Sequence, residues 1–174
     1  MNYYLPYVIE TDIKADLDFF KPYITDITWT DINVLYKKYD EYQETMVNHF
    51  VSHIETYDMK LKKFIVRLFK ELGIKSKDFR ADFFLTKAGG NMPMHIDGMS
   101  KVALLLPLTI NTGPLVCETE NTSFEICYQT LTILNTQISH GVKSPTTDRL
   151  LFRIALHDTL FEDLSIYKEY RNKL

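Results

Sequence analysis

The sequence has little of what marks a membrane-spanning, secreted or disulfide-stabilised protein. Its 174 residues include two cysteines, Cys117 and Cys127, and no run of eighteen apolar residues that could cross a bilayer as a helix. Its first residues lack the basic and apolar regions of a secretory signal peptide. We therefore expect a cytoplasmic protein with no membrane partner, in which both cysteines stay as free thiols although neighbouring strands could bring them together.

Positive charge is not in excess either. The formal net charge is −3 and the pI is about 5.9, which argues against an obligate nucleic-acid partner, because phosphate neutralisation supplies most of such affinity. Basic residues concentrate in residues 59–88, where Lys60, Lys63, Arg67 and Lys70 recur at helical spacing. We interpret this basic stripe as the solvated face of an amphipathic helix, with docking of an acidic partner as the alternative.

What the sequence does contain is enough apolar material for one packed domain. Hydrophobic residues make up 45% of the chain and aromatic residues 13%, which excludes a disordered or collagenous protein. A chain of this length can bury a proper core. We expect a single domain over residues 1–174.

The hydrophobic pattern changes period once, near residue 78. Before that point it is mostly helical: a first helix capped by Thr11 or Asp12, a second over residues 42–54, and a third that ends at Gly73. The apolar positions of the second helix are Tyr42, Met46, Phe50 and Ile54. Residues 1–78 are therefore expected to be a helical support for whatever follows.

After residue 78 the pattern favours short strands joined by short turns. The expected strands are 79–87, 93–97, 101–110, 114–119, 122–128, 130–136, 138–143 and 149–157. Eight such strands are the number that a jelly-roll needs. We predict a mainly β protein with flanking helices: a double-stranded β-helix, cupin-like, over residues 79–157, with the helical region 1–78 before it and a C-terminal helix in 158–174.

One constellation specifies a chemistry. His95-Ile96-Asp97 is followed forty-three residues later by His140, and Arg149 comes nine residues after that. Two imidazoles and a carboxylate can occupy one face of an iron(II) ion and leave the opposite positions open to substrates. His95 and Asp97 lie in a strand-like run, where residues two apart share a face. We therefore predict a metal site at His95, Asp97 and His140.

A second His-x-acid pair, His53-Ile54-Glu55, occurs in the same chain. It falls in a segment expected to be helical, where residues two apart point to nearly opposite sides. On that ground we exclude it as a chelating pair.

The residues around the first pair indicate how it is aimed. Gly89 and Gly90 supply the backbone freedom for a tight turn, and Pro93 suits a strand start or edge. The turn should direct His95 and Asp97 to the mouth of a cavity.

At these residues the sequence resembles the 2-oxoglutarate and Fe(II)-dependent dioxygenases, particularly their prolyl-hydroxylase-like and aspartyl/asparaginyl-hydroxylase-like branches. Those families carry His-x-Asp, a distal His often followed by x-Val, and an Arg nine or ten residues later, which His140-Gly141-Val142 and Arg149 match. The resemblance covers roughly residues 80–157. It implies that the strand bearing His95 and Asp97 lies across the barrel mouth from the strand bearing His140.

The resemblance also implies an activity. Fe(II) would be held by His95, Asp97 and His140, with 2-oxoglutarate and O2 as co-substrates, and Arg149 would pair with the distal carboxylate of oxoglutarate through its guanidinium fork. Arg153, on the same strand face, is the competing candidate. The expected reaction is hydroxylation of an aliphatic C–H in an amino acid, a peptidyl residue or a small metabolite. An intact Asp97 disfavours halogenation, because related halogenases replace this ligand with a small residue.

Two other classes stay open on the sequence. A cupin-like metalloenzyme of non-oxidative chemistry would share the barrel and the ligands but would not require Arg149 or oxoglutarate. A catalytically inactive jelly-roll module would bind a ligand or partner without turnover. Consumption of 2-oxoglutarate distinguishes the first alternative, and metal-independent partner binding would support the second.

Overall fold

The fold is described from a computed structural model of the chain. It describes residues 3–4, 7–36, 47–54, 58–109, 115–118, 123–126, 129–142 and 144–171. Cys127, Tyr42 and Met46 fall outside these ranges, so the pairing of the two cysteines and the first half of the second expected helix stay predictions.

The larger of two antiparallel sheets carries most of the core. Its strands lie side by side in the order β1-β2-β9-β6-β11-β5, with β4 pairing the far side of β5 and β3 pairing β4. Their bounds are β1 Tyr3–Tyr4, β2 Val8–Glu10, β3 Thr30–Asp31, β4 Val47–His53, β5 Phe79–His95, β6 Val102–Pro107, β9 Thr132–Asn135 and β11 Arg149–Leu156.

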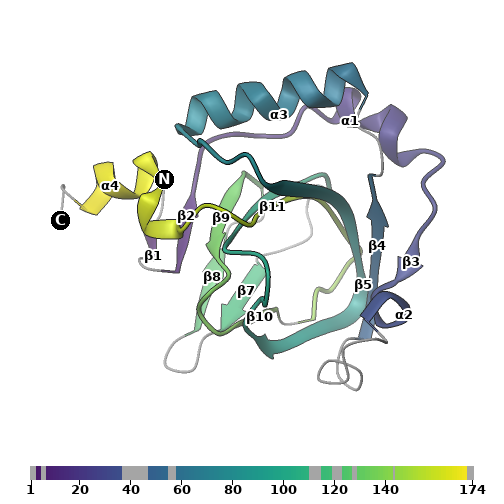
Figure 1. Cartoon of the computed structure of the whole chain (residues 1–174). Helices are drawn as coiled ribbons and strands as arrows, with labels where there is room; N and C mark the ends of the chain where they lie inside the picture. Colours follow the sequence, from purple (N-terminus) through teal and green to yellow (C-terminus); the bar gives the residue numbers. More distant parts are fainter. Residues whose placement is uncertain are drawn as a thin grey trace.

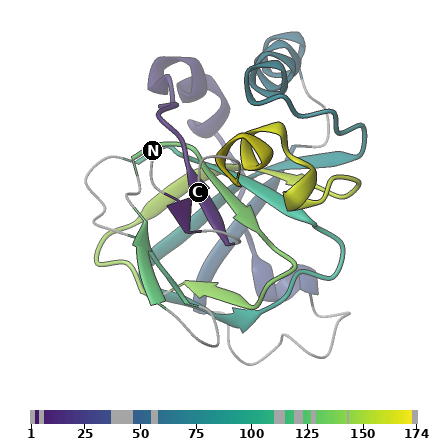
Figure 2. The same cartoon turned by 90° about the vertical axis from the view of Figure 1, so that its left-hand side faces the viewer.

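The smaller sheet faces it and shares one strand with it. The C-terminal end of β5 pairs with β10, which pairs with β7, which pairs with β8. The bounds are β7 Leu115–Glu118, β8 Ser123–Ile126 and β10 His140–Val142. The alternation of strands between two facing sheets makes the double-stranded β-helix predicted from the strand spacing, and Figure 1 and Figure 2 show the barrel from two sides.

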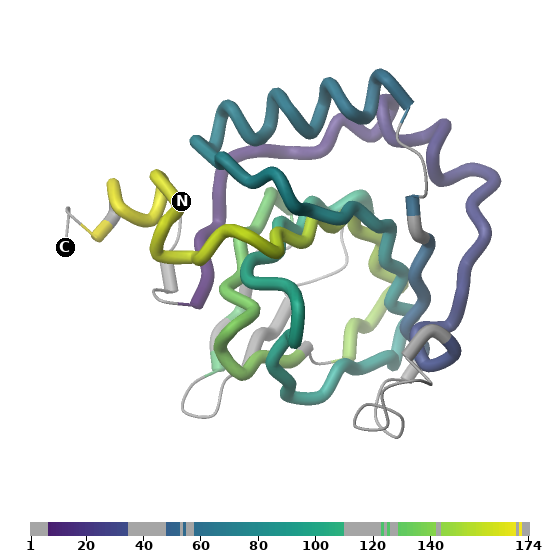
Figure 3. Tube along the Cα trace, in the orientation of Figure 1, coloured from purple at the N-terminus to yellow at the C-terminus, as the bar shows by residue number. Residues whose placement is uncertain are grey.

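β5 joins the two sheets because it bends. The sequence predicts residues 79–87 and 93–97 as separate strands around a glycine turn. Residues 79–95 instead form one strand, in which Gly89 has a φ of 76°, and Ile96 and Asp97 follow it. The tube in Figure 3 follows this strand from below the long helix round to the other side of the barrel. Its N-terminal half pairs with β11 and its end with β10, where His95 and His140 are direct partners. The two ligand strands are thus neighbours, and the expectation that they face each other across the mouth is wrong.

The second expected helix is also wrong in its described part. Phe50 lies in β4, which pairs with β5 from His49 opposite Thr86 to His53 opposite Asp82. Asn48 has a φ of 57°, and the register shifts between Val47 and His49. Such a bulge interrupts the two-residue alternation by which a strand is detected. Residues 1–78 therefore contribute strands as well as helices, and the exclusion of His53 as part of a helix used an incorrect premise.

The other two expected helices in this region are present. α1, Leu17–Ile24, is capped by the Asp16 side chain rather than by Thr11 or Asp12, and α3, Met59–Leu72, is capped by Asp58. α3 ends at Gly73 in the left-handed conformation, as expected of a glycine stop. Figure 1 shows α3 lying across the top of the barrel near α1. A short helix, α2, Ile32–Tyr36, sits between β3 and β4.

The main core lies between these helices and the outer face of the larger sheet. Phe20 of α1 packs against Phe83 of β5 and Phe152 of β11, with ring centroids 6.3 and 5.2 Å away. Leu61 and Ile65 of α3 are fully or almost fully buried in the same cluster. The basic stripe Lys60, Lys63, Arg67 and Lys70 is exposed on the opposite side of α3, as predicted. Among the described residues no helix is both long and apolar enough to span a membrane.

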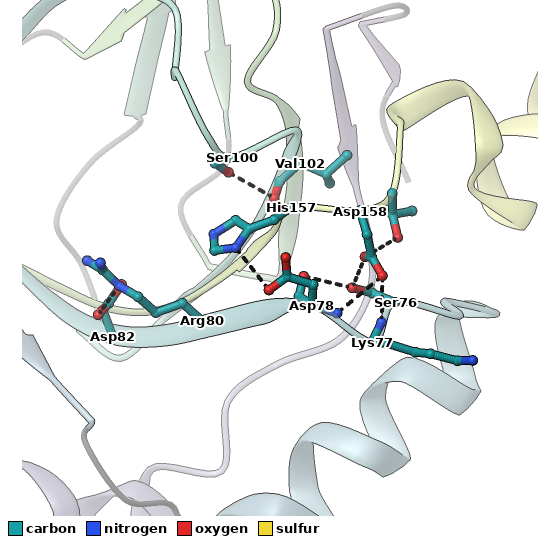
Figure 4. Close-up of polar contacts among 10 residues, drawn as sticks. Ser76, Lys77, Asp78, Arg80, Asp82, Ser100, Val102, His157 and Asp158 are labelled. Carbon is teal, nitrogen blue, oxygen red and sulfur yellow. Dashed lines mark hydrogen bonds and ion pairs between the residues drawn. The ribbon is translucent and has the colours of Figure 1, made fainter.

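A polar clasp joins the start of β5 to the end of β11. Asp158 accepts hydrogen bonds from the Ser76 hydroxyl and from the backbone N–H groups of Lys77 and Asp78 (Figure 4). The Ser76 hydrogen bond, helped by these N–H groups, lowers the pKa of Asp158 to about 2. After the clasp come a 3-10 turn, Phe161–Asp163, and α4, Ser165–Arg171, which form the expected C-terminal helix outside the barrel.

Candidate metal centre and the cavity beside it

His95, Asp97 and His140 meet at one end of a cavity inside the barrel. Each offers one ligand atom, and these atoms lie within 4.8 Å of one another. His95 ends β5 and His140 begins β10, so the pairing of these strands brings the rings to 4.4 Å between centroids. Asp97 follows in the loop after β5, with its Oδ1 3.3 Å from His95 Nε2. The three residues predicted from the sequence are therefore brought together.

Both imidazoles are held through the nitrogen that faces away from this cluster. His95 Nδ1 lies 2.8 Å from the Pro93 carbonyl oxygen, and His140 Nδ1 lies 2.8 Å from the Ile138 carbonyl oxygen. A carbonyl only accepts, so each Nδ1 must carry the proton and each neutral ring presents the lone pair of Nε2. A divalent metal needs this tautomer, and the backbone contacts are the outer partners that orient such ligands. The donor set of two Nε2 atoms and one carboxylate fits an iron(II) ion.

The protonation of the cluster reflects its mutual contacts. Burial lowers the pKa of His95, but the hydrogen bond with Asp97 and the contact with the Pro93 carbonyl outweigh it, and the net shift is upward. Burial raises the pKa of Asp97, yet the His95 hydrogen bond and the nearby cationic groups lower it overall. Burial and the charge of His95 lower the pKa of His140. A carboxylate that stays ionised beside two imidazoles suits a cation.

The cavity has a volume of about 90 Å³ and is lined by apolar as well as polar side chains. Its apolar lining comes from both sheets: Phe84, Met92, Ala103, Leu105, Leu134 and Leu151. A larger groove of about 530 Å³ lies outside the barrel between the ends of α3 and α4, and it contains no member of the triad. Because the triad lines it, the smaller cavity is the candidate site.

Arg149 lines the same cavity as part of a buried polar group, nine residues of β5 away from His95. It is 2% exposed and lies opposite Thr86, which in turn lies opposite His49 of β4. His49 Nδ1 is 3.0 Å from the Thr86 hydroxyl oxygen. Burial and the charge of Arg149 lower the pKa of His49 to about 4, so this ring is neutral near pH 7. The sequence predicted Arg149 but missed His49 and Thr86.

Arg153 lines the same cavity but is already engaged. Its Nη2 donates to Asp82 Oδ2 at 2.9 Å, and its guanidinium carbon lies 4.2 Å from the centroid of the Phe84 ring. Asp82 is fully buried and also accepts from Arg80 Nε at 3.0 Å. Arg149, Leu151 and Arg153 share one strand face, as predicted. Asp82 could have been found in the sequence, because it alternates with Phe84 and Thr86 on that inner face.

Several solved structures share this fold at low sequence identity. A prolyl-4-hydroxylase from Pseudomonas putida is 12% identical with a TM-score of 0.57, over 88% of this chain and 94% of that one. HygX from Streptomyces hygroscopicus, solved with nickel, 2-oxoglutarate and hygromycin B bound, is 12% identical with a TM-score of 0.59, over 87% and 82%. A prolyl hydroxylase from Trichoplax adhaerens, in complex with a hypoxia inducible factor oxygen degradation domain peptide fragment, is 14% identical with a TM-score of 0.57, over 87% and 82%.

In contrast to the structures, no family model and no curated protein matches the sequence. At such identities a structural likeness establishes the fold. The chain thus shares the fold of these two hydroxylases and of the oxoglutarate-bound HygX, which confirms the double-stranded β-helix expected from the sequence.

Proposed function

We propose that this chain is a 2-oxoglutarate- and Fe(II)-dependent oxygenase that hydroxylates an aliphatic C–H of an amino acid, a peptidyl residue or a small metabolite. The proposal rests on the side chains that line one cavity. A triad whose two histidines both present Nε2 stands at one end, and a buried arginine stands in the wall at the other.

His95, Asp97 and His140 would hold the iron, and their backbone contacts keep the imidazoles oriented before any metal arrives. When bound, iron supplies the activation of O2 that amino-acid side chains cannot provide. The role of the protein residues is to hold the co-substrate and the C–H in place and to limit the access of water.

Arg149 would take the distal carboxylate of oxoglutarate. A guanidinium fork matches a carboxylate through two hydrogen bonds, and the buried setting of Arg149 strengthens such a contact. Thr86 lies beside it and offers a hydroxyl. Arg153, which lines the same cavity and donates to Asp82 through Nη2, is the competing candidate.

The substrate would approach through the apolar part of the lining, where Phe84, Leu105 and Leu134 can contact a hydrocarbon segment. Two of the proteins that share this fold are solved with different bound molecules, one with a peptide fragment and the other with hygromycin B. Both a peptidyl residue and a small metabolite are therefore consistent with this barrel.

The test is anaerobic titration of the protein with Fe(II) followed by 2-oxoglutarate. A weak visible absorption band that appears only when both are present is expected, because it requires oxoglutarate to coordinate the bound iron. A protein that binds iron but develops no band would contradict the proposal and favour non-oxidative chemistry on the same barrel. Release of succinate on admission of O2 and substrate would complete the assignment.

A further inference from the structure

Asp97 differs from the two histidines in how the chain holds it. His95 and His140 sit in paired strands, whereas Asp97 comes after the last residue of β5. No strand ladder therefore fixes its backbone. Its N–H donates to the Thr136 carbonyl at 3.1 Å, in the turn that leads from β9 to His140. The position of Asp97 thus depends on contacts between two loops.

Gln137 makes most of the side-chain contacts between these loops. Its Nε2 donates to the carbonyl oxygens of Asp97 at 3.0 Å and Ser100 at 2.8 Å. Its Oε1 accepts from Lys101 Nζ at 3.1 Å. Its own backbone N–H donates to Asn135 Oδ1 at 3.1 Å. Both ends of the amide are therefore engaged with the loop that carries Asp97.

The chemistry of these partners fixes the orientation of the amide. Two carbonyl oxygens need donors, and a lysine ammonium needs an acceptor, so the NH2 group must face Asp97 and Ser100 and the oxygen must face Lys101. The amide is half-buried, and a reversed amide would leave all three contacts unfavourable. The side-chain amide of Gln137 therefore has one stable orientation.

We propose that Gln137 is a positioning residue for the metal centre, which holds the Asp97 carboxylate at a set distance from His140. The inference rests on the proposed function, since it assigns a metal to the triad. Gln137 lies three residues before His140, in the turn that leads into β10, and donates to the backbone carbonyl of Asp97. It therefore links Asp97, which lies outside the strands, to the segment that carries His140. Outer partners of this kind contribute about 10- to 100-fold to metal affinity.

The experiment is titration of the full chain with Co(II), whose visible spectrum reports the ligands around the ion. Gln137→Glu keeps the shape and the oxygen that faces Lys101 but removes both Nε2 donors. We expect Co(II) affinity to fall about 10-fold or more and the absorption bands to shift. Gln129→Glu makes the same chemical change in an exposed turn and should match the parent in affinity and spectrum.

A double-mutant cycle separates positioning of Asp97 from a general loss of structure. If Gln137 acts through Asp97, Gln137→Glu should change Co(II) affinity by less than about twofold in an Asp97→Ala background. An equal loss in both backgrounds would overturn the inference. So would parent-like Co(II) affinity and spectrum in Gln137→Glu.

Lys101→Met provides a milder variant in case Gln137→Glu does not fold, because it removes only the contact to Oε1. Lys101→Met should weaken Co(II) binding measurably, but by less than Gln137→Glu does. Unchanged Co(II) affinity in Lys101→Met would count against a positioning role for the Gln137 amide. Failure of the metal site on which the inference rests looks different: His95→Ala and His140→Ala would then bind Co(II) as tightly as the parent, whereas a metal site without oxoglutarate chemistry would leave the Gln137 result unchanged and give no visible band with Fe(II) and 2-oxoglutarate. If those two variants lose Co(II) while Gln137→Glu retains it, only the role of Gln137 is wrong.

Discussion

The two ends of the cavity are built in different ways. At the triad end the side chains of His95 and Asp97 are 10% and 21% exposed, and the ligands come from one strand, the loop after it and an adjacent strand. At the other end Arg149 and His49 are each 2% exposed and come from strands on either side of β5. The first end is therefore partly exposed through His95 and Asp97, whereas His140 is 6% exposed. The second end, where Arg149 and His49 are buried, suits an ion pair between Arg149 and a ligand carboxylate that is shielded from water.

The largest expected effect is at the triad end. His95→Ala, Asp97→Ala and His140→Ala should each lose most of the Fe(II) affinity, so that concentrations that saturate the parent leave the variants largely unloaded and their residual binding is measured at higher metal concentrations, because a three-ligand site that loses one ligand is incomplete. The fold should survive, since the core cluster on the outer face of the sheet does not include these residues. Anaerobic competition titration and circular dichroism test this. His157→Ala, a histidine outside the cavity paired with Asp78, is the control. Three variants with parental iron affinity would show that the triad is wrong.

The next effect should separate the two ends. Arg149→Ala is expected to weaken 2-oxoglutarate by about 2–4 kcal/mol, the scale of losing one partner of a desolvated charge pair, and to leave Fe(II) affinity nearly unchanged. Arg149→Lys should restore part of the loss, since it returns the charge without the planar fork. Oxoglutarate affinity is measured from the visible band of the iron complex.

Arg153→Ala serves as the contrast to Arg149→Ala. It leaves Asp82 buried with Arg80 as its remaining cationic partner, so we expect a loss of about 2 kcal/mol in the free energy of unfolding and a smaller loss of oxoglutarate affinity. If Arg153→Ala abolishes oxoglutarate binding and Arg149→Ala does not, the assignment of the two arginines must be exchanged.

A methyl group at Gly141 should disturb the triad end through the backbone. A Cβ there would lie 3.0 Å from the Met92 carbonyl oxygen and 3.1 Å from Met94 N, across the β10–β5 pairing. Gly141→Ala is therefore expected to cost about 2–3 kcal/mol in unfolding free energy and to weaken metal binding by shifting His140 from His95. Gly98→Ala, where a Cβ meets nothing within 4 Å, is the matched control. Denaturant unfolding and Co(II) titration measure both effects, and a Gly141→Ala protein with parental values would mean that the strands can separate without cost.

The buried His49 side chain should make the free energy of unfolding depend on pH. The pKa of His49 falls from 6.5 to about 4 on folding, so the unfolded chain binds more protons between these values and stability is lost as the pH falls from 6.5 towards 4. Between pH 7.5 and 5 this histidine should account for about 2 kcal/mol. His49→Gln should lose that part of the dependence, measured by urea unfolding at both pH values. Parallel curves for the parent and the variant would show that His49 is not neutral and buried.

The smallest effect lies away from both ends. The pKa of Asp158 is lowered to about 2, first by the Ser76 hydrogen bond, so its contribution is present above pH 3.8 and disappears as the pH falls towards 2. The Asp158 carboxylate is exposed, and screening by solvent reduces what its pKa shift contributes to stability. Asp158→Asn should therefore lower the free energy of unfolding by about 1 kcal/mol or less at pH 7. Metal and oxoglutarate affinities should stay at parental values. A change in either affinity would mean that the contacts of Asp158 influence the geometry of the cavity.

The sequence by itself identified the candidate site, because His95, Asp97, His140 and Arg149 form an ordered motif of residue types with a known chemistry, and the structure places the first three side by side. It also determined the strand-rich region after residue 78 and the glycine stop of α3, since periodicity and capping are local properties. Only the tertiary structure decided that β10 lies beside the end of β5 and that residues 47–53 form a strand. A bulge at Asn48 hides the alternation, and β4 is stabilised by pairing with β5, whose partner residues lie twenty-nine or more positions away in the chain. The contacts of His49, Thr86 and Gln137 depend on which segments meet, and no local pattern contains that information.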